Sequence, residues 1–566
     1  MSTLCQDRHA SRYARAVAIN DTRQSVQRVV DDLLAQGVLT DRVEVTLERP
    51  KSREHGDYAT NVALVAAKSS TIPPRELAEK IAERLSADPA FTEVRVAGPG
   101  FVNIRLSAQT QGEIAQRVVI LGSAYGRNDA LMGKSFNVEF ISANPTGPLH
   151  LGHTRWAAVG DALARVLSAA GADVTTEFYI NDRGVQMDKF GASVMAASLG
   201  QAVPEDGYHG GYILDLAARI IREHPEFHQL PAGEQLVAFR EAAYSLQLQQ
   251  QKDVLELFRT HFDVWYSERK LYDSGAVERA HTTLQEQGHV YESEGALWLR
   301  TTAFGDDKDR VLIKENGERT YFAADTAYYL DKRRRGFDTA IYLLGADHHG
   351  YVNRLRAVAA CAGDNMDENI EILIGQLVKI TRGGVEVKLS KRSGQIVTLE
   401  ELVDEVGVDA ARYTLARYPV DTPLVVDLEE IARKANDNPV FYVQYAHARI
   451  ASVLRNAQDI GALWRGGEFF PELLESDQEN ELLGVIEKFP AVITAAAELR
   501  EPHRVARYLE ELATAYHRFY DACRVLPRSD EELGGVHIAR LWVCAATQQT
   551  LANGLDLLGV SAPQKM

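Results

Sequence analysis

The chain has 566 residues, too many for one hydrophobic core, and this length suggests about three or four domains. Its formal net charge of −17 argues against indiscriminate binding to polyanions, although it leaves room for a local basic groove. No run of about 18 apolar residues predicts a membrane span. The four cysteines lack metal-ligand spacing, so we expect a reducing, cytoplasmic setting and no structural zinc.

The first 115 residues divide into an extension and a small domain. Residues 1–19 are predicted to be an N-terminal extension; their arginines also resemble a transit peptide, but we favour a frayed tail. Residues 20–115 are predicted to form a small α/β domain. There, "SVQRVVDDLLAQG" has helical spacing, and "VEVTLERP" and "FVNIRLS" alternate as strands do.

Residues 130–400 carry the pattern of a doubly wound parallel sheet. "FNVEFIS" predicts a strand, "TRWAAVGDALARVLSAAG" a helix that ends at Gly171, and "DVTTEFYIND" the next strand. Residues 190–300 are predicted to be a largely helical insertion, after which "TAIYLLGAD" and "IEILIGQLV" return to strands. The fold class is therefore α/β, with a Rossmann-like domain followed by an all-helical domain over residues 401–566.

The segment "NPTGPLHLGHTR" joins the first strand of this sheet to the helix that follows. Ligands of parallel sheets bind beyond the carboxyl ends of the strands, and a helix amino terminus favours an anion. His150 and His153 lie about one turn apart, Gly152 leaves bare backbone between them, and Pro148 suits the first turn. The loop predicts a nucleotide phosphate site. Two unrelated histidines are the alternative; a zinc site would need other spacing and a third ligand.

A second basic stretch, "VKLSKRSG", places Lys388, Lys391 and Arg392 around Ser390. Three cations on one loop suit the charge that develops on a leaving pyrophosphate. A solvated basic loop is the alternative. Because one stretch follows the first strand of the sheet and the other follows its last, the pair favours a nucleotide site.

"HLGH" and "KLSKR" resemble the two signature sequences of class I aminoacyl-tRNA synthetases. Together with "TYFAADTAYYLDK", "LLGADHHGYVNRL", "NPVFYVQYAHARI" and the C-terminal "LGVSAPQKM", they make the chain similar to the arginyl-tRNA synthetases from about residue 20 to its end. The resemblance implies that arginine and ATP, with Mg²⁺, form arginyl-adenylate and pyrophosphate. The arginyl group then passes to the 3′-terminal adenosine of tRNA(Arg). It also implies a monomer.

The resemblance also implies roles for individual residues. Catalytic and ATP-binding roles fall on Pro148, His150, Gly152, His153, Lys388, Ser390 and Lys391. Arginine-binding roles fall on Glu139, Ser142, Asn144, Tyr321, Asp325 and His348. Chemically, a guanidinium requires opposed carboxylates in bidentate geometry. Without the family context, Glu139 would be a strand-end surface acid and Asp325 an ordinary helix acid.

Two further regions are expected to contact tRNA. By resemblance, residues 20–115 bind the tRNA elbow, with Phe101 and Asn103 as candidates, and residues 401–566 bind the anticodon. Tyr445 and Arg449 combine stacking with positive charge, which suits unpaired bases, although a core helix would also carry such aromatics.

Trp156 departs from the family pattern, where many members have a small residue. It either packs behind the site or narrows the nucleotide pocket. Two rival functions are a tRNA-independent adenylyltransferase and a non-catalytic tRNA-binding relative. The first leaves the helical C-terminal part unexplained, and the second would be expected to have lost a signature histidine or lysine.

Overall fold

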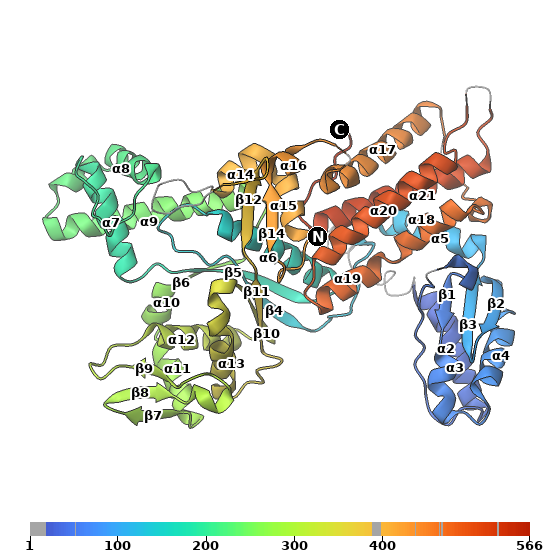
Figure 1. Ribbon diagram of the computed structural model, residues 1–566, viewed down its shortest axis with the longest axis horizontal. Coiled ribbons are helices and arrows are strands. Elements are labelled where there is room, and N and C mark those ends of the chain that lie inside the picture. The colour runs from blue at the N-terminus through green and yellow to red at the C-terminus, as the bar shows by residue number, and fades with distance from the viewer. Residues whose placement is uncertain are drawn as a thin grey trace, which may run out of the picture.

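A five-stranded parallel sheet lies at the middle of an elongated molecule (Figure 1). The structure is a computed structural model that describes residues 19–50, 52–387, 398–435, 437–462, 464–465, 468–528 and 531–566. The strand order is β11-β10-β4-β5-β6. The strands are β4 (Ser135–Glu139), β5 (Asp173–Ile180), β6 (Val264–Ser267), β10 (Thr339–Gly345) and β11 (Ile370–Gly375).

This strand order confirms the predicted doubly wound architecture. The chain builds β4, β5 and β6 outward in one direction and then returns to the other side of β4 for β10 and β11. The reversal places a topological switch point between β4 and β10, where ligands of such sheets bind. Strand β6 lies within residues 190–300, which we expected to be largely helical; its four residues are too few for the pattern to reveal it.

Helices cover both faces of the sheet. One face packs on α6 (Leu151–Ala169), whose C-terminal end is followed by Gly171 at a φ of 91°, as predicted for a helix stop. The other face packs on α12 (Tyr321–Arg334) and α13 (Val352–Cys361) in a separate hydrophobic core. A small antiparallel sheet of β7 (Val290–Ser293), β8 (Ala296–Leu299) and β9 (Arg310–Ile313), with α10 (Glu268–Asp273) and α11 (Ala276–Glu286), extends this second layer.

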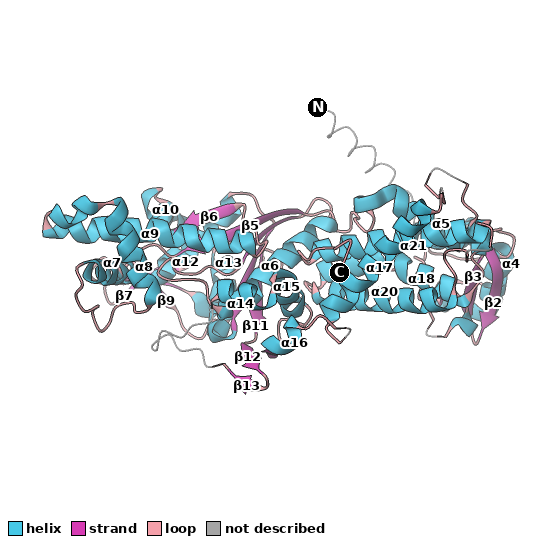
Figure 2. Cartoon of the chain, turned by 90° about the horizontal axis from the view of Figure 1, so that it is seen from above, coloured by secondary structure: helices cyan, strands magenta, loops and turns pink. Residues whose placement is uncertain are grey.

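A helical insertion projects from one end of the sheet (Figures 1 and 2). It consists of α7 (Val185–Ser198), α8 (Gly211–Glu223) and α9 (Ala232–Leu257) and has a hydrophobic core of its own. At the opposite end lies a helical bundle. Its helices are α5 (Ala108–Leu121), α15 (Val408–Ala416), α17 (Pro439–Asp459), α18 (Asp477–Glu487), α19 (Phe489–Glu498), α20 (His503–Ala522) and α21 (Gly535–Leu557).

A three-stranded sheet of β12 (Val378–Arg382), β13 (Val385–Glu386) and β14 (Leu424–Asp427), with α14 (Leu399–Val406) and α16 (Leu428–Ala432), lies between the parallel sheet and the bundle. One continuous hydrophobic core runs from α6 through this region into the bundle. Within the described residues, no helix is both long and apolar enough to cross a membrane.

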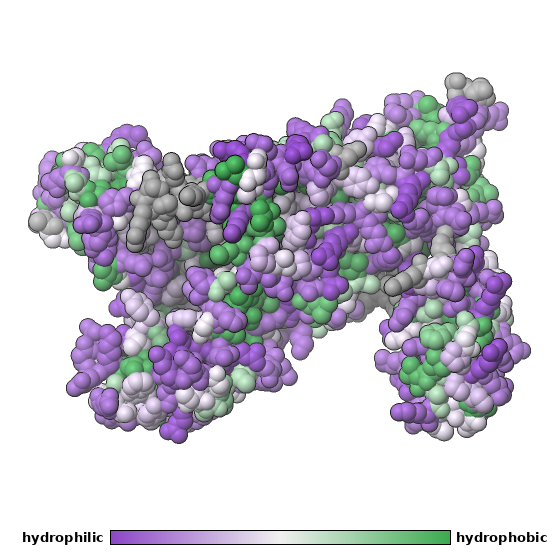
Figure 3. All heavy atoms as spheres, in the orientation of Figure 1, coloured by the Kyte–Doolittle hydropathy of each residue, from purple (hydrophilic) through white to green (hydrophobic). Residues whose placement is uncertain are grey.

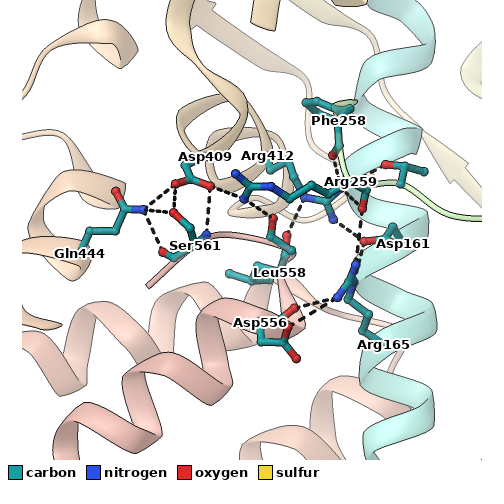
Figure 4. A network of polar contacts seen from close by, with 12 residues as sticks. Asp161, Arg165, Phe258, Arg259, Asp409, Arg412, Gln444, Asp556, Leu558 and Ser561 are labelled. Carbon is teal, nitrogen blue, oxygen red and sulfur yellow. Dashed lines mark hydrogen bonds and ion pairs between the residues drawn. The ribbon is translucent and has the colours of Figure 1, made fainter. Parts of the chain in front are cut away.

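Buried polar contacts reinforce the junction between α6 and the bundle (Figure 4). The fully buried guanidinium of Arg412 in α15 donates to the carbonyls of Phe258 and Leu558, at 2.8 and 2.9 Å, and forms an ion pair with Asp161 of α6. Gly559 has a φ of 64°, and a Cβ there would lie 2.3 Å from Arg412 Nη2, so only glycine fits. The C-terminal tail is thereby tied to the helix that the histidine loop opens.

The N-terminal domain is a separate lobe with its own core. It contains α2 (Ile19–Ala35), α3 (Val62–Val65), α4 (Pro74–Leu85) and an antiparallel sheet of β1 (Tyr58–Thr60), β2 (Phe91–Ala97) and β3 (Phe101–Leu106). The predicted strand "FVNIRLS" is confirmed as β3, whereas "VEVTLERP" was wrong as a strand. In this segment only Glu48 pairs with a strand, as a single bridge to Ala59 of β1. Nearer its start the backbone bonds to Gln27 of α2, which donates to the Val43 carbonyl at 3.0 Å and accepts from Val45 N at 2.9 Å.

Candidate active site

The carboxyl end of β4 turns sharply at the switch point. Ile141 and Ser142 have φ values of 69° and 45°, a left-handed conformation that residues with side chains rarely adopt. The turn brings Ser142 Oγ back to Glu139, to which it donates at 2.9 Å, while the same oxygen accepts from Tyr179 N at 3.2 Å. Backbone strain of this kind costs about 1–3 kcal/mol and concentrates at ligand-binding sites.

The two predicted histidines cap the amino terminus of α6. His150 Nδ1 accepts from Gly152 N at 3.1 Å, and His153 Nδ1 accepts from His150 N at 3.2 Å. Their ring centroids are 3.9 Å apart. Because both Nδ1 atoms accept, the neutral rings carry their protons on Nε2, as hydrogen-bond donors at a helix end that favours anions.

Gly152 keeps this turn open. A Cβ at Gly152 would lie 3.0 Å from His150 Cε1, closer than nearly all real Cβ contacts, and the glycine itself is exposed. Any larger residue would push the His150 ring aside or cover the helix end.

The described chain resumes beside this loop after the second basic stretch. Lys388, Ser390, Lys391 and Arg392 lie outside the described residues. The described residue Thr398, which follows the stretch, forms a β-bridge with His150, and Leu399 N donates to Leu149 O at 2.9 Å. Thr398 and Leu399 therefore lie next to the loop that carries the histidines.

Three carboxylates meet beyond β4 and β5. Burial, and then the charges of Glu268, Asp325 and Glu139, raise the pKa of the Tyr179 phenol, which lies among them. Burial and the charge of Glu268 raise the pKa of Asp325 to about 7, and burial and the charge of Asp182 raise that of Glu268 to about 7. A cluster of carboxylates that includes two with raised pKa values favours a cationic ligand.

Glu268 was not predicted from the sequence. It begins α10 directly after β6 and is 5% exposed. Since β6 itself was not predicted, nothing marked Glu268 as the residue at a strand end. Its position after a sheet strand is the signal that could have found it.

Glu139 is held from behind by Lys332 of α12. The Lys332 ammonium lies 2.6 Å from Glu139 Oε2 and donates to Asn137 Oδ1 at 2.7 Å, and its side chain is fully buried. Glu139 is therefore fixed on one oxygen by Lys332 and on the other by Ser142, as a pre-oriented acceptor.

Three other residues predicted to bind arginine, His348, Asn144 and Tyr321, have the following surroundings in the structure. Tyr351 donates to Asp325 Oδ2 at 3.4 Å, and the His348 ring lies 6.2 Å from the Tyr351 ring. Asn144 donates through Nδ2 to Gln186 at 2.6 Å. Tyr321, by contrast, is 76% exposed at the start of α12.

Trp156 packs behind the site, on the end of β11. A Cβ at Gly375 would lie 2.2 Å from the Trp156 ring, so the tryptophan occupies the space that this glycine leaves. The neighbouring Arg155, also buried, donates to the carbonyls of Pro419, at 2.7 Å, and Gln376, at 3.0 Å. Trp156 thus packs α6 on the end of β11, and Arg155 bonds α6 to the chain that follows.

The candidate RNA-binding residues lie on two separate lobes. On the bundle, Arg449 lies 4.0 Å from the Tyr520 ring centroid and 5.9 Å from that of Tyr445, which is 36% exposed. On the N-terminal domain, Phe101 is 41% exposed and Asn103 half-buried, both on β3. The space-filling view shows an open concavity between the N-terminal lobe and the lobe of β7–β9 (Figure 3). Within the described residues, no group of three or more His, Cys, Asp or Glu side chains could hold a metal ion.

Comparison with known families covers almost the whole chain. Residues 118–452 match the model "tRNA synthetases class I (R), catalytic domain". Residues 20–106 match "Arginyl tRNA synthetase N terminal domain", and residues 443–566 match "DALR anticodon binding domain".

Individual relatives agree with these matches. An arginine–tRNA ligase of Paenarthrobacter aurescens is 54% identical over 94% of this chain and 96% of its own length. One from Micrococcus luteus is 55% identical over 94% and 95%. Among solved structures, the Thermus thermophilus arginyl-tRNA synthetase has a TM-score of 0.72 at 22% identity, over 97% of this chain and all of that one, and shares the fold.

Proposed function

This chain belongs to the arginyl-tRNA synthetases of class I, and we propose which of its residues carry out the reaction of that family. In that reaction, arginine is activated with ATP to arginyl-adenylate and pyrophosphate and is then transferred to the 3′-terminal adenosine of tRNA(Arg). The observation that carries the assignment is the meeting of three carboxylates, Glu139, Asp325 and Glu268, at the switch point beside the histidine-capped helix.

The guanidinium of arginine lies between Glu139 and Asp325 in this proposal. Lys332 and Ser142 each hold one oxygen of Glu139, which leaves its remaining lone pairs for a planar, bidentate donor. Glu268 adds charge from the β6 side. Citrulline would leave buried carboxylates without a cation, and lysine cannot present a planar fork.

The other end of the amino acid faces the nucleotide. We assign Ser142, Asn144 and His348 to its α-amino and α-carboxylate groups and Tyr321 to the mouth of the pocket, where this exposed ring would close over the ligand. The strained turn at Ile141 and Ser142 supports this assignment, because it directs this segment away from the sheet and toward α6.

ATP lies at the amino terminus of α6. His150 and His153 donate from Nε2 to its phosphates, and Pro148 and Gly152 line the adenine side. Mg²⁺ arrives with the triphosphate as part of the substrate. Lys388, Ser390 and Lys391 neutralise the leaving pyrophosphate; the β-bridge between His150 and Thr398 supports their arrival at the same place.

The chemistry is an in-line displacement. A carboxylate oxygen of arginine attacks the α-phosphorus, the bond from that phosphorus to the bridging oxygen breaks, and pyrophosphate leaves with the electron pair. In the second step, a hydroxyl of the terminal adenosine attacks the arginyl carbonyl, loses its proton, and AMP departs. The protein's contribution is to position the groups and stabilise the developing charge.

tRNA(Arg) spans the two lobes in this proposal. Phe101 and Asn103 of the domain at residues 20–115 contact the elbow, and Tyr445 and Arg449 of residues 401–566 contact the anticodon arm. The exposure of Phe101 and Tyr445 supports this assignment, and stacked aromatic and guanidinium groups suit unpaired bases. Residues 130–400 form the catalytic domain, and we propose that the protein acts as a cytoplasmic monomer.

ATP–pyrophosphate exchange tests the proposal. Exchange is expected with arginine, to increase strongly when tRNA(Arg) is added, and to be absent with lysine or glutamate. Asp325→Ala should raise the KM for arginine far more than that for ATP. Equal effects on both would remove Asp325 from the pocket, and exchange with another amino acid would overturn the assignment.

A further inference from the structure

The helical insertion is a unit that extends from the active-site loop. Its core of Phe190, Ile213, Ile220 and Phe239 is separate from the core of the sheet. Helix α9, 26 residues long, runs from that core into the main core, where Leu255 is buried. Because a continuous helix is stiff, the insertion and the sheet are joined by a rod rather than a loose linker.

Each helix of the insertion places one side chain on residues 144–147, which lead into the histidine turn. Tyr212 of α8 donates through its hydroxyl to Thr146 O at 3.1 Å. Gln251 of α9 donates through Nε2 to Asn144 O at 3.1 Å and to Gly147 O at 2.8 Å. From α7, Gln186 accepts from the Asn144 side chain.

Gln251 is well placed to hold the loop firmly. Its side chain is 1% exposed, so water does not compete for its bonds, and its Oε1 has no partner among the described residues. The two donated bonds therefore define the orientation of its amide. These two bonds reach the carbonyls of Asn144 and Gly147, on either side of Pro145 and Thr146, and so fix both ends of the short loop.

We propose that Tyr212 and Gln251 are positioning residues for ATP: they hold loop 144–147 so that His150 and His153 present their Nε2 atoms to the triphosphate. The inference rests on the proposed role of the two histidines. It assigns the insertion a second task besides packing, because the orientation of α8 and α9 then sets the affinity of the nucleotide site.

Two conservative substitutions test this. Tyr212→Phe removes one hydrogen bond without changing the ring, and Gln251→Met removes two donors at nearly constant shape. Gln249→Met is the matched control, since Gln249 is exposed on the same helix and bonds to Asp253. The assay is ATP–pyrophosphate exchange with saturating tRNA(Arg), with ATP and arginine varied in turn.

Tyr212→Phe is expected to raise the KM for ATP by about 2- to 10-fold, the factor that one neutral hydrogen bond is worth, and Gln251→Met, which loses two bonds, by at least as much. Tyr212→Phe should leave the KM for arginine within about twofold of the wild-type value, because Thr146 is not among the proposed arginine ligands. A purely structural role would lower the melting temperature without this split.

The proposal is overturned if the KM for ATP in both variants equals that of Gln249→Met, or if Tyr212→Phe raises the two KM values equally. Failure of the wild-type protein to exchange with arginine would instead overturn the proposed function. Equilibrium binding of ATP to the same variants, with no amino acid added, keeps the two outcomes distinct: unchanged ATP affinity in both would again reject the positioning role.

Discussion

Arginine binding should strengthen as the pH rises from 6 to 8. Burial raises the pKa of both Asp325 and Glu268 to about 7, and the charge of Glu268 contributes to the shift of Asp325. Arg354 lowers the pKa of the first carboxyl and Arg183 that of the second, without reversing either shift. Because the two acids interact, they titrate as a pair, and the empty pocket holds about one proton near neutrality.

The guanidinium keeps its charge throughout this range, so only the protein groups titrate. It binds the ionised carboxylates, and its arrival must expel the shared proton. For one group with a pKa of about 7, the ionised fraction is about one tenth at pH 6 and about nine tenths at pH 8. The dissociation constant for arginine should therefore fall about tenfold over these two pH units.

Isothermal titration calorimetry measures this directly. Arginine is titrated into the protein with tRNA(Arg) bound, in buffers of different ionisation enthalpy, so that the number of protons released is obtained beside the affinity. We expect roughly one proton released per arginine at pH 6.5. In Asp325→Asn, which cannot ionise at that position, affinity should be weaker and its pH dependence flatter. Arginine affinity that is constant from pH 6 to 8, with no proton release, would refute the reasoning, because the carboxylates would then be ionised before the ligand arrives.

Three substitutions extend these expectations. In exchange kinetics, Glu268→Gln should raise the KM for arginine about 10- to 100-fold, because the substitution removes one buried charge from the arginine site. The KM for ATP should stay within about twofold of the wild-type value. Equal changes in the two KM values would place Glu268 outside the arginine site. Gly375→Ala should lower the free energy of unfolding, measured by urea denaturation, by about 1–3 kcal/mol, because the new Cβ would overlap the Trp156 ring. An unchanged free energy of unfolding would mean that the ring moves aside at no cost. In the same experiment, Lys332→Met should lower the free energy of unfolding by about 3–5 kcal/mol, since Glu139 would remain buried without its ammonium partner. A decrease below about 1 kcal/mol would show that the ion pair of Lys332 and Glu139 is not needed for stability.

The parts of the site that follow one another in the sequence could be predicted from it. The strand, the histidine turn and α6 form one local unit, and the spacing of His150 and His153 at a helix start has a direct physical meaning. The four longer strands of the parallel sheet were identifiable by composition, and their order follows from the doubly wound pattern.

Contacts between distant segments could not be predicted. Lys332 is an ordinary helical lysine until α12 packs on the sheet and buries it against Glu139. Glu268 depends on β6, whose four residues carry too little pattern to be recognised. Residues 43–45 alternate as a strand does but pair with Gln27 of α2, because side-chain amides can replace a neighbouring strand as hydrogen-bond partners.

The central claim is that the guanidinium of arginine is bound among the carboxylates at the switch point while ATP sits on the capped end of α6. A crystal structure with a non-hydrolysable arginyl-adenylate analogue tests both halves at once. The guanidinium should lie within hydrogen-bond distance of Glu139 and Asp325, with the adenosine over Gly152. An analogue bound with its guanidinium in solvent, or away from α6, would contradict the account.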